Sequence, residues 1–321
     1  MGMDRFLAVR CEAAEDDAAE QDAAKDDAAE HDAADGGVDG LPISTNTYPW
    51  RTHAQRNREG DGYRPVSRQT MQAIRDSGLT AFEPILDTPD QLVGMAEKMA
   101  ECSLSMPTIY VNSVLHDANR VDASIDNVLA TAAAAHDLGA RICVTNPSPI
   151  RWGGDENKDD AQLRLQAKSL DRLGGGLADL GVTLAYHNHD AEFRQGGREF
   201  HHMLTATDPD VVKLCLDSHW IFRGCGDSEL AVMDAIAHYG SRTVELHLRQ
   251  STEGIYDEKF SLQGDLNYVA ITTMLASLGV RPIMVLEQAV EEGSPQTLDP
   301  IAAHRASVLP AQTLKRQFSG G

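Results

Sequence analysis

The sequence predicts a (βα)8 TIM barrel, an α/β fold, preceded by an acidic and disordered N-terminal tail. Two observations lead to this prediction. After Gly40, eight short apolar runs alternate with longer segments of helical periodicity, and polar residues stand at the ends of most runs. Short strands that alternate with helices indicate a parallel sheet. Eight such units within residues 41–321 fit a single closed barrel domain.

The first 40 residues form a segment of different composition. They contain 13 acidic and 3 basic residues, and from Ala13 to Asp35 they repeat a five-residue unit of two alanines and three mostly acidic residues. A five-residue step does not gather the alanines on one face of a helix. We therefore expect residues 1–40 to be a solvated, disordered tail that catalysis does not need.

The predicted barrel elements follow in order along the chain. The strands are expected at 41–46, 79–84, 106–112, 141–146, 182–188, 211–217, 243–248 and 282–287. Helices are expected within 65–77, 89–102, 121–138, 159–180, 228–239 and 266–278, where apolar residues recur at three- and four-residue spacing. Four of these helices are expected to stop at a glycine, namely Gly78, Gly139, Gly181 and Gly279.

A doubly wound open sheet is the rival fold. That fold usually has a glycine-rich phosphate-binding turn after its first strand. Here residues 43–53, ISTNTYPWRTH, contain no glycine. The sequence therefore favours the barrel.

The net charge and the composition indicate which partners the protein is expected to avoid and in which compartment it is expected to lie. The formal net charge of -21 disfavours nucleic acid and anionic membranes. No apolar run approaches the ~20 residues that span a bilayer, and the N-terminus lacks a signal-peptide pattern, so we expect a cytoplasmic protein. The five cysteines show no paired spacing and are expected to be reduced thiols. Only 7 Lys beside 21 Arg in so acidic a chain suggests a salt-adapted, halophilic cytosol.

Four polar residues end consecutive predicted strands. His187, Asp217, His247 and Glu287 lie 30, 30 and 40 residues apart, about one βα unit each. Any one of them alone could be an ordinary hydrogen-bonded rim residue or a helix cap. Together they would place two imidazoles and two carboxylates at the C-terminal face, where barrel active sites lie. Such a donor set suits a divalent cation such as Mn²⁺ or Zn²⁺ better than Ca²⁺.

Several runs also resemble those of a known family. AYHNHDAEF (185–193), LDSHWIFRGCGD (216–227), ELHLRQS (245–251), QGDLNY (263–268) and VLEQ (285–288) are similar in order and spacing to the xylose-isomerase-like sugar phosphate isomerase/epimerase barrels. The resemblance spans residues 41–290. It implies a divalent metal held by four residues from strands five to eight, with the two family Glu ligands also moving protons. Asp217, His247 and Glu287 match the last three of those ligands.

The first ligand departs from the family pattern. Where the ketose epimerases have Glu, strand five offers His187 and His189 on one face. We assign His187 to the metal and His189 to acid/base chemistry, and the reverse assignment stays open. Arg249-Gln250 replaces the common Lys-Asp pair, and Gln263 replaces a frequent Glu, so the substrate is not specified.

The expected reaction is proton transfer next to a carbonyl through an enediolate, as in a metal-dependent sugar (phosphate) isomerase or epimerase. Glu287 would take the proton, and His189 or Glu192 would return one to the other face. A lyase or dehydratase of the same barrel is the alternative, and a non-catalytic carbohydrate-binding barrel is a third hypothesis. Mn²⁺ is the expected metal, with Zn²⁺, Co²⁺ or Mg²⁺ as alternatives. The substrate would be a small sugar or cyclitol, and a homo-oligomer is compatible with the sequence. The predicted substrate-binding residues are Trp50, Glu83, Asn112, Trp220 and Arg249.

Overall fold

The computed structural model describes residues 42–57 and 67–318, so the predicted tail at 1–40 lies outside the described residues. The described chain forms a parallel barrel sheet with the order β2-β1-β11-β8-β7-β6-β5-β4-β3. Its strands are β1 (Ser44–Asn46), β2 (Ala81–Glu83), β3 (Ile85–Leu86), β4 (Thr108–Val111), β5 (Ile142–Thr145), β6 (Thr183–His187), β7 (Val212–Asp217), β8 (Thr243–Leu248) and β11 (Ile283–Leu286). A separate antiparallel hairpin joins β9 (Ser251–Thr252) to β10 (Ile255–Tyr256).

The barrel closes through one interrupted strand. β2 and β3 are consecutive pieces separated by Pro84, which has no backbone N–H to donate to a sheet ladder. β2 pairs with β1, while β3 pairs with β4. The Tyr110 N–H donates to the Pro84 carbonyl at 3.0 Å, so the sheet continues across the break. Counted this way the barrel has eight staves, which confirms the predicted fold and excludes the open sheet.

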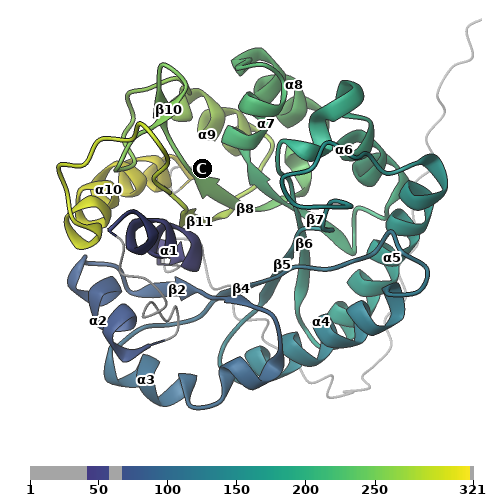
Figure 1. Ribbon diagram of the computed structural model, residues 1–321, viewed down its shortest axis with the longest axis horizontal. Coiled ribbons are helices and arrows are strands. Elements are labelled where there is room, and N and C mark those ends of the chain that lie inside the picture. Colours follow the sequence, from purple (N-terminus) through teal and green to yellow (C-terminus); the bar gives the residue numbers. More distant parts are fainter. Residues whose placement is uncertain (1–41, 58–66, 319–321) are drawn as a thin grey trace, which may run out of the picture. The chain divides into compact units, whose positions relative to one another are not determined.

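The helices surround the strands (Figure 1). They are α1 (Thr47–Arg56), α2 (Arg68–Asp76), α3 (Met95–Glu101), α4 (Val121–His136), α5 (Asp160–Asp179), α6 (Arg194–Ala206), α7 (Ser218–Gly224), α8 (Glu229–Tyr239), α9 (Tyr268–Ser277) and α10 (Pro300–Lys315). The short 3₁₀ helices are η3 (Pro89–Leu92), η4 (Ala191–Phe193), η5 (Gly240–Arg242) and η6 (Arg316–Phe318). Among these described helices, none is long and apolar enough to cross a membrane.

Local sequence signals set the helix boundaries. Asp159 begins α5 with a capping box, in which its side chain accepts from the Gln162 N–H while the Gln162 side chain accepts from the Asp159 N–H. At the other ends, the predicted stops are confirmed by positive φ at Gly78, Gly139, Gly181 and Gly279. Glycine suits these positions because a side chain would be strained in the left-handed region.

Two apolar layers hold the barrel together. The larger one packs the outward faces of the strands against the helices. The smaller one fills the barrel interior and includes Ile142, Val144, Ala185, Cys215 and Val285. Toward the C-terminal ends of the strands, the residues that face the barrel interior are polar. The register aligns Asp217 with His247, so neighbouring strands deliver polar side chains at a common height.

Candidate active site

Four strand ends converge on one point at the C-terminal side of the barrel. His187 ends β6, Asp217 ends β7, His247 lies in β8, and Glu287 follows β11. All four are buried, and one ligand atom from each lies within 4.8 Å of the others. The structure therefore brings together the set predicted to bind metal.

His247 lies at the centre of this cluster. Its Nδ1 is 2.8 Å from Glu287 Oε2, and its Nε2 is 3.0 Å from Glu245 Oε1. Although burial opposes a charged ring, the Cys215 thiol and the Glu287 carboxylate hold the pKa of His247 well above its usual range. Burial and the nearby Glu83 raise the pKa of Glu245 well above its usual range. One imidazole thus joins carboxyl groups on both of its sides.

Arg249 supplies the fixed positive charge of the cluster. Its Nε lies 3.0 Å from Asp217 Oδ2 and donates to Glu287 Oε2 at 3.1 Å, and its Nη2 contacts the same Glu287 oxygen. Burial favours the protonated acid, yet Arg249 and His247 hold the pKa of Glu287 well below its usual range. Burial outweighs the Arg249 charge at Asp217 and raises the pKa of that carboxyl to about 6.

The donor atoms of the cluster fit a divalent cation. His187 Nε2 and Asp217 Oδ2 are fully buried, lie 3.8 Å apart, and have no hydrogen-bond partner among the described residues. Burial and the adjacent His189 ring hold the pKa of His187 well below its usual range, which keeps it neutral and able to ligate. Neutral imidazoles with carboxylates are ligands for Zn²⁺ and similar metals. Neither His187 Nε2 nor Asp217 Oδ2 has a hydrogen bond within the described chain, although Asp217 Oδ2 lies in the ion pair with Arg249, and a bound cation would satisfy both.

The comparison with protein families agrees with this geometry. The family model described as "Xylose isomerase-like TIM barrel" matches residues 71–309. The chain belongs to this family.

Relatives of this xylose isomerase-like barrel include a rhizopine catabolism protein and an inosose dehydratase. The rhizopine catabolism protein MocC of Rhizobium meliloti is 24% identical over 267 residues, covering 77% of this chain and 81% of MocC. An inosose dehydratase of Geobacillus kaustophilus is 21% identical over 202 residues, covering 59% of this chain and 63% of that protein. The crystal structure of a sugar phosphate isomerase/epimerase from Parabacteroides distasonis shares the fold, with a TM-score of 0.65 at 16% identity over 87% of this chain and 95% of that chain.

His189 lies beside the candidate metal cluster, with its ring centroid 4.7 Å from that of His187. It is half-buried, and its ring centroid is 5.3 Å from Trp152 and 5.5 Å from Trp220. Its Nδ1 and the Trp220 Nε1 have no hydrogen-bond partner among the described residues. Burial and the Arg249 charge lower the pKa of His189 to about 3, so the ring is neutral near pH 7. Two polar atoms are thus available to a ligand next to aromatic rings.

Glu192 supports the loop after β6. Its Oε2 accepts from the His189 N–H at 2.7 Å, and its Oε1 accepts from Asn146 Nδ2 at 3.1 Å. Burial and the nearby Glu199 carboxylate raise the pKa of Glu192 to about 7. Both oxygens therefore have partners, one in the backbone that carries His189 and the other in the Asn146 side chain.

The predicted substrate-binding residues differ from one another in their surroundings and in their distance from the cluster. Trp220 and Arg249 lie together, with the guanidinium carbon 5.0 Å from the indole centroid. Glu83 is fully buried, with Oε1 3.5 Å from His247 Nε2. Trp50 is 4% exposed and stacks on His304 at 4.1 Å, which places it in the packing between α1 and α10. Asn112 is exposed after β4, and within the described chain it makes no hydrogen bond to the cluster.

Other residues of the site were not predicted from the sequence. Asn46 Nδ2 donates to Glu287 Oε1 at 2.6 Å, and the Tyr110 hydroxyl is 3.4 Å from His187 Nδ1. Tyr256 accepts from Arg249, and burial raises its pKa to about 12. The end of the first predicted strand could have indicated Asn46. Glu245 is the largest omission, because it lies inside the run TVELHL two residues before His247 and on the same face.

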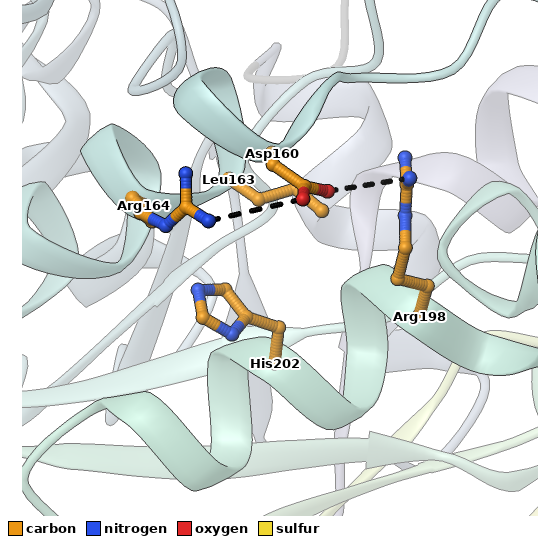
Figure 2. Close-up of a pocket in the computed structure, with 5 residues that line it drawn as sticks. All are labelled: Asp160, Leu163, Arg164, Arg198 and His202. Atoms are coloured by element: carbon orange, nitrogen blue, oxygen red, sulfur yellow. Dashed lines mark hydrogen bonds and ion pairs between the residues drawn. The ribbon is translucent and has the colours of Figure 1, made fainter.

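A separate pocket between α5 and α6 lies on the outside of the barrel (Figure 2). It has a volume of about 150 Å³ and is lined by Asp160, Leu163, Arg164, Arg198 and His202. Figure 2 shows Asp160 between the two arginines, at 3.8 Å from Arg164 and 3.5 Å from Arg198. The acid and the arginines of this pocket already pair with each other, and His202 Nε2 is its one buried side-chain atom without a hydrogen-bond partner among the described residues, so the pocket lacks the set of such atoms that marks the barrel site.

Proposed function

We propose that this protein is a metal-dependent enzyme that moves a proton next to the carbonyl of a small sugar or cyclitol, in the manner of an isomerase or epimerase. The observation that supports it is the buried cluster of His187, Asp217, His247 and Glu287, whose ligand atoms lie within 4.8 Å of one another. Burying two carboxylates and two imidazoles is costly unless they pair with other groups or coordinate a metal, and such clusters gather at functional sites. A divalent cation held there would polarise the carbonyl oxygen and stabilise the negative charge that develops on proton removal.

The side chains around the cluster supply the remaining chemistry. Glu287 is held ionised by Arg249 and is oriented through Oε1 by Asn46, so it can accept a proton at a fixed position. His189 is neutral and has a free Nδ1, so it can exchange a proton on another side of the substrate. For this second role His189 offers a nitrogen without a hydrogen-bond partner among the described residues, whereas the two Glu192 oxygens accept from the His189 N–H and from Asn146.

The surroundings of His189 suit a polyol. Trp152 and Trp220 flank its ring, and the Trp152 side chain is 55% exposed. Aromatic faces pack against the C–H faces of a sugar ring, while the Trp220 Nε1 and the His189 Nδ1 can bond to its hydroxyls. The net charge of -21 supports a neutral polyol more than a highly charged substrate.

A dehydratase is the second candidate, because curated relatives of the chain include an inosose dehydratase and MocC. Its first step would be the same proton abstraction. The two functions differ in whether the intermediate regains a proton at carbon or expels a β-hydroxyl, which would leave as water with the proton that Glu287 has taken up.

Product analysis separates these candidates. Metal-loaded protein would be incubated with a panel of keto-sugars and inososes in D₂O, followed by NMR and mass spectrometry. An epimerase or isomerase gives an isomer of unchanged mass apart from incorporated deuterium. A dehydratase gives a product lighter by one water. Binding without deuterium incorporation or product across the panel would instead favour the carbohydrate-binding hypothesis.

A further inference from the structure

Glu245 is a buried acid on the inner side of the metal cluster. It lies in the middle of β8, is fully buried, and places Oε1 3.0 Å from His247 Nε2. The other ring nitrogen, Nδ1, faces the opposite way, 2.8 Å from Glu287 Oε2. The His247 ring therefore has one edge toward the candidate ligands and one edge toward Glu245.

The two nitrogens of an imidazole cannot serve the same purpose at once. A neutral ring that gives the lone pair of Nδ1 to a cation must carry its only hydrogen on Nε2. That N–H points at Glu245 Oε1, which can accept it. The opposite tautomer, with its hydrogen on Nδ1, would place the Nε2 lone pair against Glu245 and Glu83. The Glu83 Oε1 lies 3.5 Å from Nε2.

We propose that Glu245 is a positioning residue that fixes the tautomer and orientation of His247 for metal binding. The inference rests on the proposed metal-dependent function. Carboxylates that accept from the second nitrogen of a ligating histidine raise its basicity, and their loss typically weakens metal binding by about 10–100-fold. Glu245 does this without contacting the substrate, because it lies below His247 in the barrel interior.

Neighbouring groups keep Glu245 in place. Cys215 Sγ contacts Glu245 Oε1 at 3.6 Å, and Thr108 donates to Glu83 Oε2 at 2.9 Å. The remaining oxygens, Glu245 Oε2 and Glu83 Oε1, are buried without a hydrogen-bond partner among the described residues. The two acids therefore place several acceptor oxygens next to His247 Nε2. These oxygens favour a protonated Nε2 that can donate to them and disfavour an unprotonated nitrogen.

The substitution Glu245→Gln tests this role, with Thr243→Val as the matched control. Thr243 lies on the same strand and face, is buried, and has a hydroxyl without a hydrogen-bond partner among the described residues. The dissociation constant for Mn²⁺ would be measured by competition with a chelating dye, alongside metal stoichiometry. We expect Glu245→Gln to weaken binding by about 10–100-fold at unchanged stoichiometry, and Thr243→Val to stay within about twofold.

A measurement on the unmodified protein keeps the inference testable if Glu245→Gln does not fold. In the Zn²⁺-loaded protein, long-range ¹H–¹⁵N correlation spectra should show His247 protonated at Nε2 and coordinated through Nδ1. A ring coordinated through Nε2, or a Glu245→Gln constant within twofold of wild type, overturns the inference. A metal stoichiometry in Glu245→Gln that falls below that of wild type would overturn it too, because Glu245 would then itself be a ligand. Wild-type protein that binds no divalent metal would instead refute the proposed function, and this role with it.

Discussion

The Arg249 guanidinium lies 3.0 Å from Asp217 Oδ2, so a permanent cation contacts one of the two carboxylates of the candidate metal cluster. The same group binds Glu287 and lies near the faces of Trp220 and Tyr48. Arg249 therefore compensates the charge of the two carboxylates in the metal-free protein. In the proposed function, a divalent cation would compete with Arg249 for these oxygens.

The first prediction follows from this competition. Removing one partner of a buried ion pair typically costs about 3–5 kcal/mol, so Arg249→Met should lower the melting temperature of the metal-free protein. Saturating Mn²⁺ should then raise the melting temperature more than it does in wild type. Arg223→Met is the control, since Arg223 pairs with Glu291 and stacks on Tyr256 instead. An unchanged metal-induced shift in Arg249→Met would show that the two cations do not compete.

The second prediction concerns Asp217 as a ligand. Its Oδ1 caps α7 by accepting from the His219 and Trp220 N–H groups, while Oδ2 faces His187. Asp217→Asn keeps an oxygen for the cap but removes the charge, so the fold should persist while bound metal is lost. Metal content by mass spectrometry and the melting temperature check both parts. Asp299→Asn, a cap of α10 remote from the cluster, should retain metal. Stoichiometric metal in Asp217→Asn would remove Asp217 from the ligand set.

The third prediction separates His189 from His187. His189→Gln should keep the metal and lower turnover by about 10²-fold or more, the usual size of an acid/base contribution. His187→Gln should lose the metal as well. Turnover and metal content would be measured on the same preparations, with His202→Gln on α6 as the control. Loss of metal in His189→Gln and its retention in His187→Gln would reverse the two assignments.

The fourth prediction concerns acid stability away from the site. Burial lowers the pKa of His53 to about 4 and that of His304 to about 3, whereas an unfolded chain titrates near ~6.5. Between these values the unfolded chain binds more protons, so the free energy of unfolding falls as the pH drops from ~6.5 to about 4. Each histidine contributes a slope of up to about 1.4 kcal/mol per pH unit. His304→Phe keeps the stack on Trp50 and should flatten this slope.

The control for the acid-stability prediction is His238→Phe, since His238 is exposed on α8. Urea denaturation at pH 7, 6, 5 and 4 gives the slopes. A His304→Phe slope as steep as that of His238→Phe would show that the buried ring does not titrate on unfolding.

The sequence predicted the barrel and its strand ends well, because each signal is local. Apolar runs that end in His187, Asp217 or Glu287 predict both a strand and the polar residue at its C-terminal end. Glu245 was missed since it lies inside an apolar run, where only its pairing with the His247 ring reveals its place. For Trp50 the sequence left a pocket wall and a core position open as alternatives, and the partner on which it stacks, His304, lies more than 250 residues further along the chain. Such a long-range contact leaves no local pattern.

The central claim is that Glu287 removes a proton next to a carbonyl. Glu287→Gln keeps an oxygen for a metal and nearly the same volume, but it cannot accept the proton. The decisive measurement is exchange of the substrate α-hydrogen with D₂O, followed by NMR at saturating Mn²⁺ with metal content and melting temperature recorded on the same preparation. We predict exchange in wild type and a decrease of at least ~10²-fold in Glu287→Gln with metal and fold intact. Exchange near the wild-type rate in that variant would contradict the account.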